Sequence, residues 1–516
     1  MSDSASRLLF IRIDPRQRKP LQFQIYENIR RAILGGILAR GTRLPSSRAL
    51  AADLGVSRIT TVLAFEHLAA EGYVTSRTGA GTFVSRELPD ASARAPESSR
   101  RREPQHPPLS RRGLTLSQMP PIVTKIDGPP RAFRTGTPAL DRFPFQTWKR
   151  LVSRHMRRLT AHQLEYGDAA GQPSLRAAIA DYVSRARGTS CTADQVIVVA
   201  GAQQALDLIA RSLLDPGDVA WMEEPGYPGA RSALLAAGAR IQPVRVDAQG
   251  LDVEYGEQRS NLARLVITTP SHQFPLGVPM SLPRRLALLA WARAAGAWVV
   301  EDDYDSEFRY GARPIPCLHG LDTDGRVIYV GSFSKTLFPA LRLGYIIVPP
   351  DLHATMRQAR VSLDLRPQGV LQAVVADLMN DGHFDRHLRR MNSEYRVRLG
   401  ALVEAVARYC GGVLSLRPVV TGLHAVADLK ESDATLVSNE ARARGVETMP
   451  LSAYYYDRRS SPENSLMLGF GSVAPRLVTA GVKRLAEAID AASSKAPRAI
   501  RKSAASGAQA RRISVL

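Results

Sequence analysis

Apolar side chains recur at helical spacing in three short stretches near the start of the chain. The stretches run from Leu21 to Ile33, through Leu50 and Leu54, and onward from Thr61 at positions i, i+3, i+4 and i+7. Glycines separate the stretches, and this spacing predicts three helices with a tight turn between the second and the third. Two short helices joined by such a turn are a candidate helix-turn-helix.

A strand pattern follows the third helix. Residues 73–77 and 82–84 are rich in β-branched and aromatic side chains, and a Gly-Ala-Gly turn at 79–81 separates them. This pattern predicts a β-hairpin. A helix-turn-helix followed by a hairpin forms a winged helix, so we predict an α+β winged helix-turn-helix domain over residues 16–85.

A much longer region, residues 131–492, alternates strand-like runs with helix-like runs. The strand-like runs are apolar and mostly β-branched, at 196–199, 265–268, 297–300 and 327–330. Alternation of this kind predicts an α/β domain with a largely parallel sheet. Ligands of such domains bind at the C-terminal ends of the strands, so the residues just after each run are the candidates for a binding site.

Two segments lack apolar periodicity. Residues 86–130 are rich in proline, serine and arginine, which predicts a flexible or partly extended linker. Residues 493–516 form a basic tail for which we predict no fixed structure. We expect the linker arginines to be solvated, and contact with DNA phosphates is the alternative.

Length and charge narrow the class of protein. A chain of 516 residues is too long for one hydrophobic core, and a net charge of +21 favours nucleic acid, rather than a membrane surface, as a polyanionic partner. Cys191, Cys317 and Cys410 lie far apart, which indicates a reducing compartment without a disulfide framework or a metal site. We find no membrane-length apolar stretch and no signal-peptide pattern, so we expect a soluble cytoplasmic protein.

The residue types of the winged helix suit duplex DNA. The first turn of the second helix of a helix-turn-helix reaches base edges in the major groove, while residues at the turn and on the wing contact phosphates. The alternative is a small helical domain with a solvated basic face. The candidate DNA-binding residues are Arg43, Ser46, Arg48, Ser57, Arg58, Thr60, Thr61, Arg77, Gly79 and Gly81.

A lysine with phosphate-binding neighbours follows the last of the strand-like runs. The amine of Lys335 can form a Schiff base with an aldehyde. Ser332, Ser334 and Arg342 can hold a dianionic phosphate. Pyridoxal phosphate (PLP) carries both groups, so we predict a PLP site, with a plain surface lysine as the alternative.

Residues after the other runs meet the remaining needs of this cofactor. Asp302 can keep the pyridine nitrogen protonated, and Tyr304, two residues on, can reach the ring hydroxyl. Tyr227 offers an aromatic face, and the helix that begins at 201–203 offers its amides to the phosphate. Taken singly, Asp302 is one of several acids that could be solvated, and Tyr227 could be a turn or core residue.

Both regions resemble known families. The first resembles GntR-type winged-helix regulators in the segments 44–48, 54–58, 71–73 and 79–84. The second resembles fold-type I aminotransferases in the segments 201–207, 223–227, 269–275, 301–305 and 332–335. Together they resemble the MocR subfamily of bacterial transcriptional regulators, in which the two folds are fused.

The resemblance implies roles for individual residues. It implies that Lys335 forms the Schiff base, that Asp302 binds the pyridine nitrogen and that Tyr304 binds the ring hydroxyl. It also implies a phosphate site of Ser332, Ser334, Arg342 and the backbone of Ala202 and Gln203. Tyr166 matches a tyrosine that such folds send to the partner subunit's phosphate. A homodimer follows, with domains exchanged head-to-tail.

Two positions depart from the aminotransferase pattern. Phe274 stands where an asparagine usually precedes the Pro-x-Gly turn, and His272 or Gln273 could take over the contact to the ring hydroxyl. Met467 stands where an arginine usually binds the substrate carboxylate. Because methionine offers no charge-assisted hydrogen bond, we expect little turnover.

These features favour a PLP-dependent DNA-binding transcriptional regulator that senses an effector. Because the carboxylate clamp is missing, we favour PLP itself over an amino compound as effector, with control of vitamin B6 metabolism as one output. The first alternative is an active aminotransferase with an accessory DNA-binding domain. The second is a constitutive DNA-binding protein in which the PLP fold serves only to dimerise.

Overall fold

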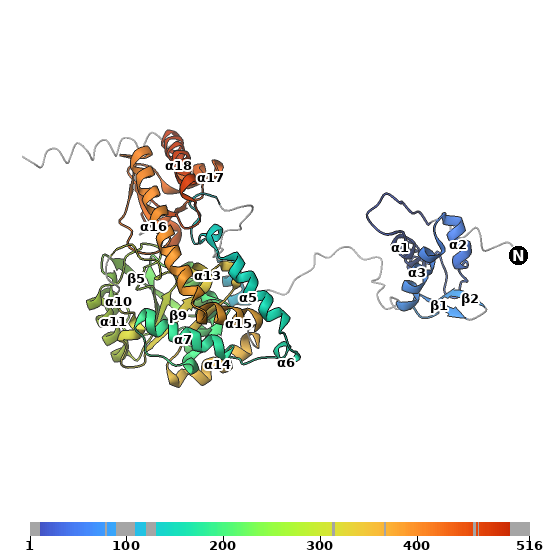
Figure 1. The fold of residues 1–516 in the computed structure, drawn as a ribbon, viewed down its shortest axis with the longest axis horizontal. Coiled ribbons are helices and arrows are strands. Elements are labelled where there is room, and N and C mark those ends of the chain that lie inside the picture. Colours follow the sequence, from blue (N-terminus) through green and yellow to red (C-terminus); the bar gives the residue numbers. More distant parts are fainter. Residues whose placement is uncertain are drawn as a thin grey trace, which may run out of the picture. The chain divides into compact units, whose positions relative to one another are not determined.

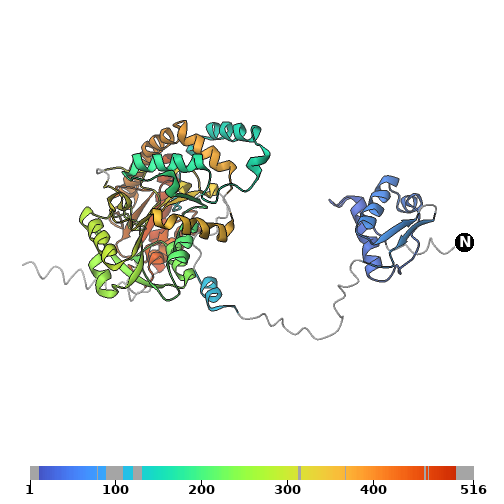
Figure 2. The same ribbon diagram turned by 90° about the horizontal axis from the view of Figure 1, so that it is seen from below.

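The computed structural model describes residues 11–77, 80–88, 109–119, 131–311, 315–365, 368–457, 461–462 and 464–495. The chain divides into two compact units, residues 1–108 and 109–516. Figures 1 and 2 show the helices and strands of both units. Within the described residues, no helix is long and apolar enough to cross a membrane.

The N-terminal unit is a winged helix-turn-helix, as predicted. Its elements are α1 (Leu21–Leu34), α2 (Ser47–Leu54), α3 (Arg58–Ala70), β1 (Val74–Arg77) and β2 (Gly81–Val84). The left-handed conformation of Gly55, with φ of 63°, ends α2 and makes the turn to α3. The apolar faces of the three helices pack with the hairpin around Ile25, Leu50 and Leu68, each with none of its surface exposed.

The larger unit is built on an eight-stranded sheet. Along the sheet the strands are β3 (Val196–Val199), β10 (Gly344–Ile347), β9 (Val327–Ser332), β8 (Trp298–Asp303), β7 (Ala263–Thr268), β4 (Val219–Glu224), β5 (Arg240–Asp247) and β6 (Gly250–Leu251). The strands from β9 to β5 are parallel, while β10 and β6 run antiparallel to their neighbours. The prediction of a largely parallel sheet is therefore confirmed. The run predicted at 297–300 extends as strand β8 to Asp303, so the acidic cluster begins inside the sheet.

Helices cover both faces of this sheet. They are α5 (Phe145–Arg157), α6 (Ala161–Leu164), α7 (Pro173–Arg187), α8 (Ala202–Leu213), α9 (Pro228–Ala237), α10 (Val253–Arg259), α11 (Leu282–Ala295), α12 (Leu318–Leu321), α13 (Phe333–Thr336), α14 (Pro350–Asp364) and α15 (Val370–Asn380). Side chains of α8, α9 and α14 pack on one face, against Ile267 and Val300. Side chains of α10 and α11 pack on the other face, against Val266 and Val299. Alternate residues of one strand thus serve two cores, as expected for a buried parallel sheet.

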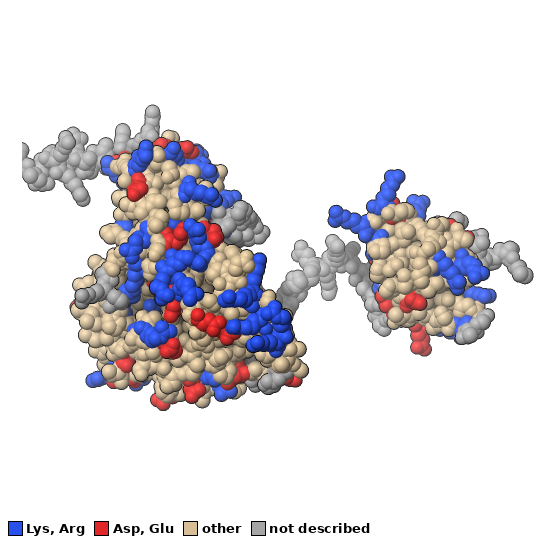
Figure 3. Space-filling view, in the orientation of Figure 1, with Lys and Arg blue, Asp and Glu red and all other residues tan. Residues whose placement is uncertain are grey.

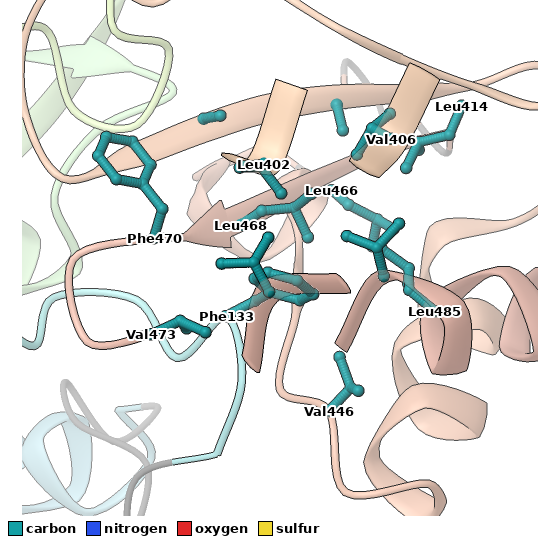
Figure 4. Packing of buried hydrophobic residues seen from close by; sticks show 14 of the residues in the cluster. Phe133, Leu402, Val406, Leu414, Val446, Leu466, Leu468, Phe470, Val473 and Leu485 are labelled. Carbon is teal, nitrogen blue, oxygen red and sulfur yellow. The ribbon is translucent and has the colours of Figure 1, made fainter. Parts of the chain in front are cut away.

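A smaller lobe completes the unit. It contains α16 (His383–Tyr409), β11 (Leu414–Leu416), β12 (His424–Leu429), α17 (Ala434–Ala443), β13 (Met449–Pro450), β14 (Ser465–Gly469) and α18 (Pro475–Lys495), with the antiparallel strand order β11-β12-β14-β13. Figure 4 shows its core, in which Phe133 packs with Leu466 and Leu468 of β14. The helix α16 belongs to both lobes, because Phe384 packs in the large-lobe core and Leu402 in the small-lobe core.

One helix lies where we expected only an irregular linker. Residues Arg111–Ser117 form α4, and the Ser110 hydroxyl caps it by accepting a hydrogen bond of 3.0 Å from the Gly113 amide. α4 packs against α9, and Leu116 and Met119 face a groove that also contacts α9. A few leucines among many arginines give too weak a periodic signal to find a seven-residue helix, which needs its partner to be stable.

Basic side chains gather on one face of the larger unit. Figure 3 shows Lys and Arg in blue over α16 and α5, in the orientation of Figure 1. Exposed members on these two helices are Lys149, Arg150, Arg157, Arg386, Arg389, Arg390 and Arg396. Part of this charge is paired, since Arg154 bridges to Asp377 and Asp381.

Candidate functional site

The predicted cofactor residues meet at the carboxyl edge of the large sheet. Asp302 lies near the end of β8 and pairs in register with Val330 of β9. β9 leads through Ser332 into the short helix α13, which carries Lys335. Neighbouring parallel strands end at one edge, so residues distant in sequence reach a common site.

The Lys335 amine lies in the interior of this site. Its Nζ donates a hydrogen bond of 2.6 Å to the Gly136 carbonyl. Burial lowers the pKa of the Lys335 amine, while the charges of Asp305 and Asp302 act in the opposite direction. A lowered pKa increases the fraction of neutral amine, which is the form that attacks an aldehyde.

Asp302 is a buried carboxyl with an unused acceptor. Burial raises the pKa of Asp302 to about 7, and the charges of Asp303 and Glu223 add to this effect. Within the described part of the chain, its Oδ1 atom has no hydrogen-bond partner. An unpaired buried carboxyl oxygen is costly unless a donor arrives, and a protonated pyridine nitrogen is such a donor. The residues therefore fit PLP at this position.

Tyr227 stands at the entrance of helix α9, next to the same carboxyl. It is the N-cap residue of α9, directly after the turn that ends β4. Burial raises the pKa of Tyr227 to about 12, followed by the charge of Asp302, while Arg342 lowers it. Its ring meets that of Phe274 edge to face at 5.7 Å. Tyr227 therefore lies between the predicted nitrogen contact and the predicted phosphate contact, where a stacked ring would need it.

The N-terminus of α8 and an arginine form the phosphate end. Gly201 caps α8 with φ of 92°, and a Cβ atom there would lie 3.5 Å from Nη1 of Arg342. The guanidinium thus lies beside the first amides of α8, those of Ala202 and Gln203. Helix amides together with an arginine suit a dianion. The Gln203 side chain points elsewhere, since its Nε2 donates to the Gly229 carbonyl at 3.0 Å.

The two serines of the predicted phosphate site flank the lysine. Ser332 Oγ accepts a hydrogen bond of 3.2 Å from the Ser334 amide and caps α13.

A groove of about 700 Å³ lies outside the phosphate end of the site, lined by Gln203, Arg342, Leu116 and Met119 among others. The linker helix α4 therefore borders the same surface as the phosphate end.

The structure separates the two residues considered as substitutes for the missing asparagine. Gln273 is committed to packing, because its Nε2 donates to Glu223 and to the Pro225 and Phe274 carbonyls. His272 is not committed in this way and lies beside Tyr304, with its Nδ1 atom 2.8 Å from the tyrosine oxygen. His272 has a second contact that local spacing does not predict, because its Nδ1 also lies 2.8 Å from Oδ1 of Asp305.

Met467 lies in an apolar wall. It is fully buried on β14 and packs with Val426, Leu451 and Tyr454. Phe274 extends this cluster, with its ring 5.1 Å from that of Tyr454. Apolar and aromatic side chains from several segments therefore surround the position where aminotransferases usually carry the carboxylate-binding arginine.

Tyr166 lies apart from the buried cofactor residues. It follows α6, and 75% of its surface is exposed. Leu164 and Met156 nearby in sequence are also exposed, by 72% and 54%. Large apolar side chains exposed together often mark a protein interface.

Most of the residues predicted to contact DNA are exposed, whereas one of them is buried. Ser57 and Arg58 are exposed at the start of α3, and Ser57 Oγ caps it through the Thr60 amide at 3.3 Å. Thr61 was wrongly expected at this face. It is fully buried, and its hydroxyl donates to the Ser47 and Arg58 carbonyls at 2.8 and 2.9 Å, so it holds α2 against α3.

The wing brings two arginines together. The Arg77 guanidinium lies 5.6 Å from the Phe83 ring, and Arg43 pairs with Phe83 through a β-bridge. A Cβ at Gly81 would lie 3.0 Å from Arg43 Nε. Ser46 caps α2 through the Ala49 amide at 3.1 Å, and Arg48 is exposed on the first turn. Gly79 lies outside the described residues.

Comparison with known proteins matches both units. Residues 134–465 match the family model "Aminotransferase class I and II", and residues 21–84 match "Bacterial regulatory proteins, gntR family". The chain is 41% identical to the probable rhizopine catabolism regulatory protein MocR of Rhizobium meliloti, over 91% of this chain and 94% of that protein. It is 32% identical to the pyridoxine biosynthesis transcriptional regulator PdxR of Corynebacterium glutamicum, over 90% and 94%.

The large unit also resembles a solved enzyme. A kynurenine aminotransferase of Pyrococcus horikoshii, determined in complex with PMP, superposes with a TM-score of 0.64 and 30% identity. The match covers 69% of this chain and 90% of the enzyme chain.

Proposed function

Because the chain belongs to the MocR-type GntR regulators, with an aminotransferase-fold unit behind a winged helix, we propose that it is a transcriptional regulator that binds PLP through Lys335. The winged helix, proposed to span 16–85, binds an operator, and the unit proposed to span 131–492 senses the effector. Residues 86–130 serve as the linker between them. The observation that carries the proposal is the buried, unpaired Oδ1 of Asp302 at one site with the Lys335 amine.

The effector that the site favours is PLP itself or a related amino compound. Groups suited to the ring nitrogen, the aldehyde and the phosphate are all present, whereas the wall around Met467 offers apolar contacts. An α-carboxylate brought against that wall would lose its hydration without gaining a charged partner. Control of vitamin B6 metabolism is one output that agrees with this preference and with the relative PdxR, which is named as a pyridoxine biosynthesis transcriptional regulator.

The regulator works as a homodimer in the cytoplasm in this proposal. Tyr166 is exposed, as are Leu164 and Met156 nearby in the sequence, which is expected for a tyrosine that reaches the partner subunit's phosphate. The head-to-tail arrangement of the dimer follows the family resemblance. Cys191, Cys317 and Cys410 are unpaired thiols, which agrees with a reducing compartment.

DNA binding to the region upstream of the chain's own gene, measured with and without PLP, tests the proposal. We expect PLP to change the affinity several-fold, because an effector shifts an equilibrium by its difference in affinity for the two states. The variant Lys335→Ala should lose this response while keeping basal DNA binding. DNA binding that is indifferent to PLP in the native chain contradicts the sensor function.

An active aminotransferase with an accessory DNA-binding domain is the second candidate. The site favours it in one respect, because Lys335, Asp302 and Tyr304 are all present at one edge of the sheet. Steady-state transamination of an amino acid, abolished by Lys335→Ala, would establish it. We expect little or no turnover because Met467 offers no charged partner to a substrate carboxylate.

A further inference from the structure

Three side chains form a hydrogen-bonded chain behind the cofactor site. His272 Nδ1 lies 2.8 Å from Asp305 Oδ1 and 2.8 Å from the Tyr304 oxygen. Only 2% of the His272 surface and 1% of the Asp305 surface are exposed. One ring nitrogen therefore faces two oxygens in a place that water does not reach.

The charge of Asp305 decides which atom carries the hydrogen. A carboxylate only accepts hydrogen bonds, so a bare Nδ1 would set two lone pairs against each other at 2.8 Å. Nδ1 must therefore carry a hydrogen and donate it to Asp305. A protonated Nδ1 has no lone pair left, so it cannot accept the hydrogen of Tyr304.

The phenol hydrogen of Tyr304 is consequently free for another acceptor. Burial raises the pKa of Tyr304 well above its ordinary value, and the charges of Asp305 and Asp302 add to this, so the phenol keeps its hydrogen. Tyr304 follows the strand end that carries Asp302. The acceptor on that side is the ring oxygen of the cofactor, if PLP binds as proposed above.

We propose that His272 is a positioning residue, which, held by Asp305, directs the hydrogen of Tyr304 to the ring oxygen of the bound cofactor. His272 thus replaces the function of the missing asparagine without touching the ring. The inference rests on the proposed binding of PLP, and it concerns the direction of one hydrogen bond.

The surroundings hold the imidazole in one orientation. A Cβ at Gly422 would lie 1.9 Å from His272 Cε1, and one at Gly277 would lie 3.3 Å from Nε2. The His424 ring lies 4.9 Å away and is fixed by a 3.0 Å hydrogen bond to the Pro275 carbonyl. A half-turn of the ring would set the carbon Cδ2 against both oxygens, so the contacts of Nδ1 favour the observed orientation.

The charged groups around the ring agree with this assignment. Burial lowers the pKa of His424 to about 3, so this neighbour is neutral. The charge of Asp305 raises the pKa of Lys335 more than the charge of Asp302 does. His272, Asp305 and His424 also lie close enough to share a metal ion, and a metal bound through Nδ1 would require that atom to be bare. The state of Nδ1 therefore separates the positioning role from a metal bound at this atom.

Absorbance titration of the full-length protein with PLP bound tests the role. A donor to the ring oxygen stabilises its negative charge and so weakens its hold on the neighbouring protonated Schiff base. In His272→Leu the Asp305 carboxylate loses its donor and competes for the Tyr304 hydrogen, so the ring oxygen loses part of this donor and the pKa of the Schiff base should rise. We expect His272→Leu to favour the protonated form by about three- to tenfold, which is the size of one hydrogen bond.

Matched variants separate this effect from a loss of folding. His272→Asn keeps a donor close to the place of Nδ1 and should titrate like the native protein. His353→Asn alters a half-buried histidine of α14 and should also leave the titration unchanged. In a Tyr304→Phe background, His272→Leu should have no further effect, because the hydrogen that it directs is gone.

A second measurement reads the state of Nδ1 directly in the native protein. Nitrogen-15 NMR of the native protein, with His272 assigned by His272→Asn, should show a hydrogen on Nδ1. A bare Nδ1 overturns the inference, as does stoichiometric Zn²⁺ binding to the native chain that His272→Asn abolishes. An unchanged titration in His272→Leu overturns the inference too, and it leaves the proposed function standing if PLP still binds and still changes DNA binding. DNA binding that does not respond to PLP contradicts the proposed function instead of this inference.

Discussion

The two walls of the cofactor site follow opposite chemistry. The wall formed by β8, β9 and α13 carries ionisable groups, with Asp302 buried and Lys335 half-buried. The wall formed by Met467 of β14 and Val426 of β12 is apolar, and it reaches the Tyr304 ring through Phe274, whose ring lies 5.8 Å away. An aminotransferase needs one wall to hold the cofactor and the other to hold a substrate carboxylate.

This difference between the two walls indicates which ligand groups the site suits. Burying ionisable groups costs stability, so their presence on the first wall indicates a ligand that compensates them. The second wall packs like an ordinary protein core, with Tyr454 and Phe274 in contact at 5.1 Å. The groups on the first wall suit a cofactor, and none of the described residues in the apolar cluster carries a charge that would orient an amino acid.

Removing the amine should have the largest effect on the first wall. In Lys335→Ala no covalent bond to PLP can form, so the visible absorbance band of the bound cofactor should disappear completely. Lys430→Ala, which removes an exposed lysine, should leave the band unchanged. A band that persists in Lys335→Ala would mean that another amine binds the aldehyde.

Restoring an arginine on the second wall should disrupt it. We expect Met467→Arg to destabilise the larger unit by about 3–5 kcal/mol, because the position is fully buried among apolar groups. Thermal unfolding measures the change, and Met467→Leu should cost less than about 1.5 kcal/mol. A stable Met467→Arg protein that binds an α-amino acid would show that only the charge was missing.

The cofactor-free protein should lose stability as pH rises through the range of Asp302. Its pKa is raised to about 7 in the fold from an ordinary 3.8, so the folded state holds an extra proton between about pH 4 and pH 7. Stability contributed by that proton is present below pH 4 and lost as pH approaches and passes 7. Asp302→Asn should remove up to about 4 kcal/mol of this change in the free energy of unfolding, measured by unfolding across the range.

Glu301 provides the control for this pH dependence. Burial raises its pKa to about 7 as well, but its carboxylate accepts hydrogen bonds from the Leu318 and His319 amides. The slope that remains in Asp302→Asn should therefore resemble the contribution of Glu301. Added PLP should flatten the slope of the native protein and leave that of Asp302→Asn unchanged.

Loss of the phosphate arginine should have the smallest effect of the four. We expect Arg342→Ala to weaken PLP binding by about tenfold, because the amides of α8 and the serine hydroxyls remain. Arg293→Ala, which removes an exposed arginine of α11, is the matched control. Equal affinities for the native and Arg342→Ala proteins, measured by titration calorimetry, would place the phosphate elsewhere.

The sequence predicts the first wall better than the second. Lys335 and Asp302 lie in short segments next to strong strand patterns, so local spacing was enough to place them. The contact of His272 with Asp305 joins residues 33 positions apart, and no local period reports such a pair. The cluster around Met467 likewise gathers residues from several segments, which depends on how the small lobe packs against the large one.

Burial explains the errors at the N-terminal unit and in the linker. Thr61 occupies the inner side of α3, and its polar hydroxyl suggested a DNA contact where the structure uses it to join two helices. The leucines of α4 were too few for a helical period, and their meaning depends on the presence of α9. Both cases turn on a neighbour that is distant in sequence.

The seat of α4 on α9 also sets the length of the tether between the two units. With α4 held, the connecting chain spans residues 88–109, and covalent geometry limits its reach to about 70 Å. Release of α4 would extend the tether to residue 131 and its limit to about 150 Å.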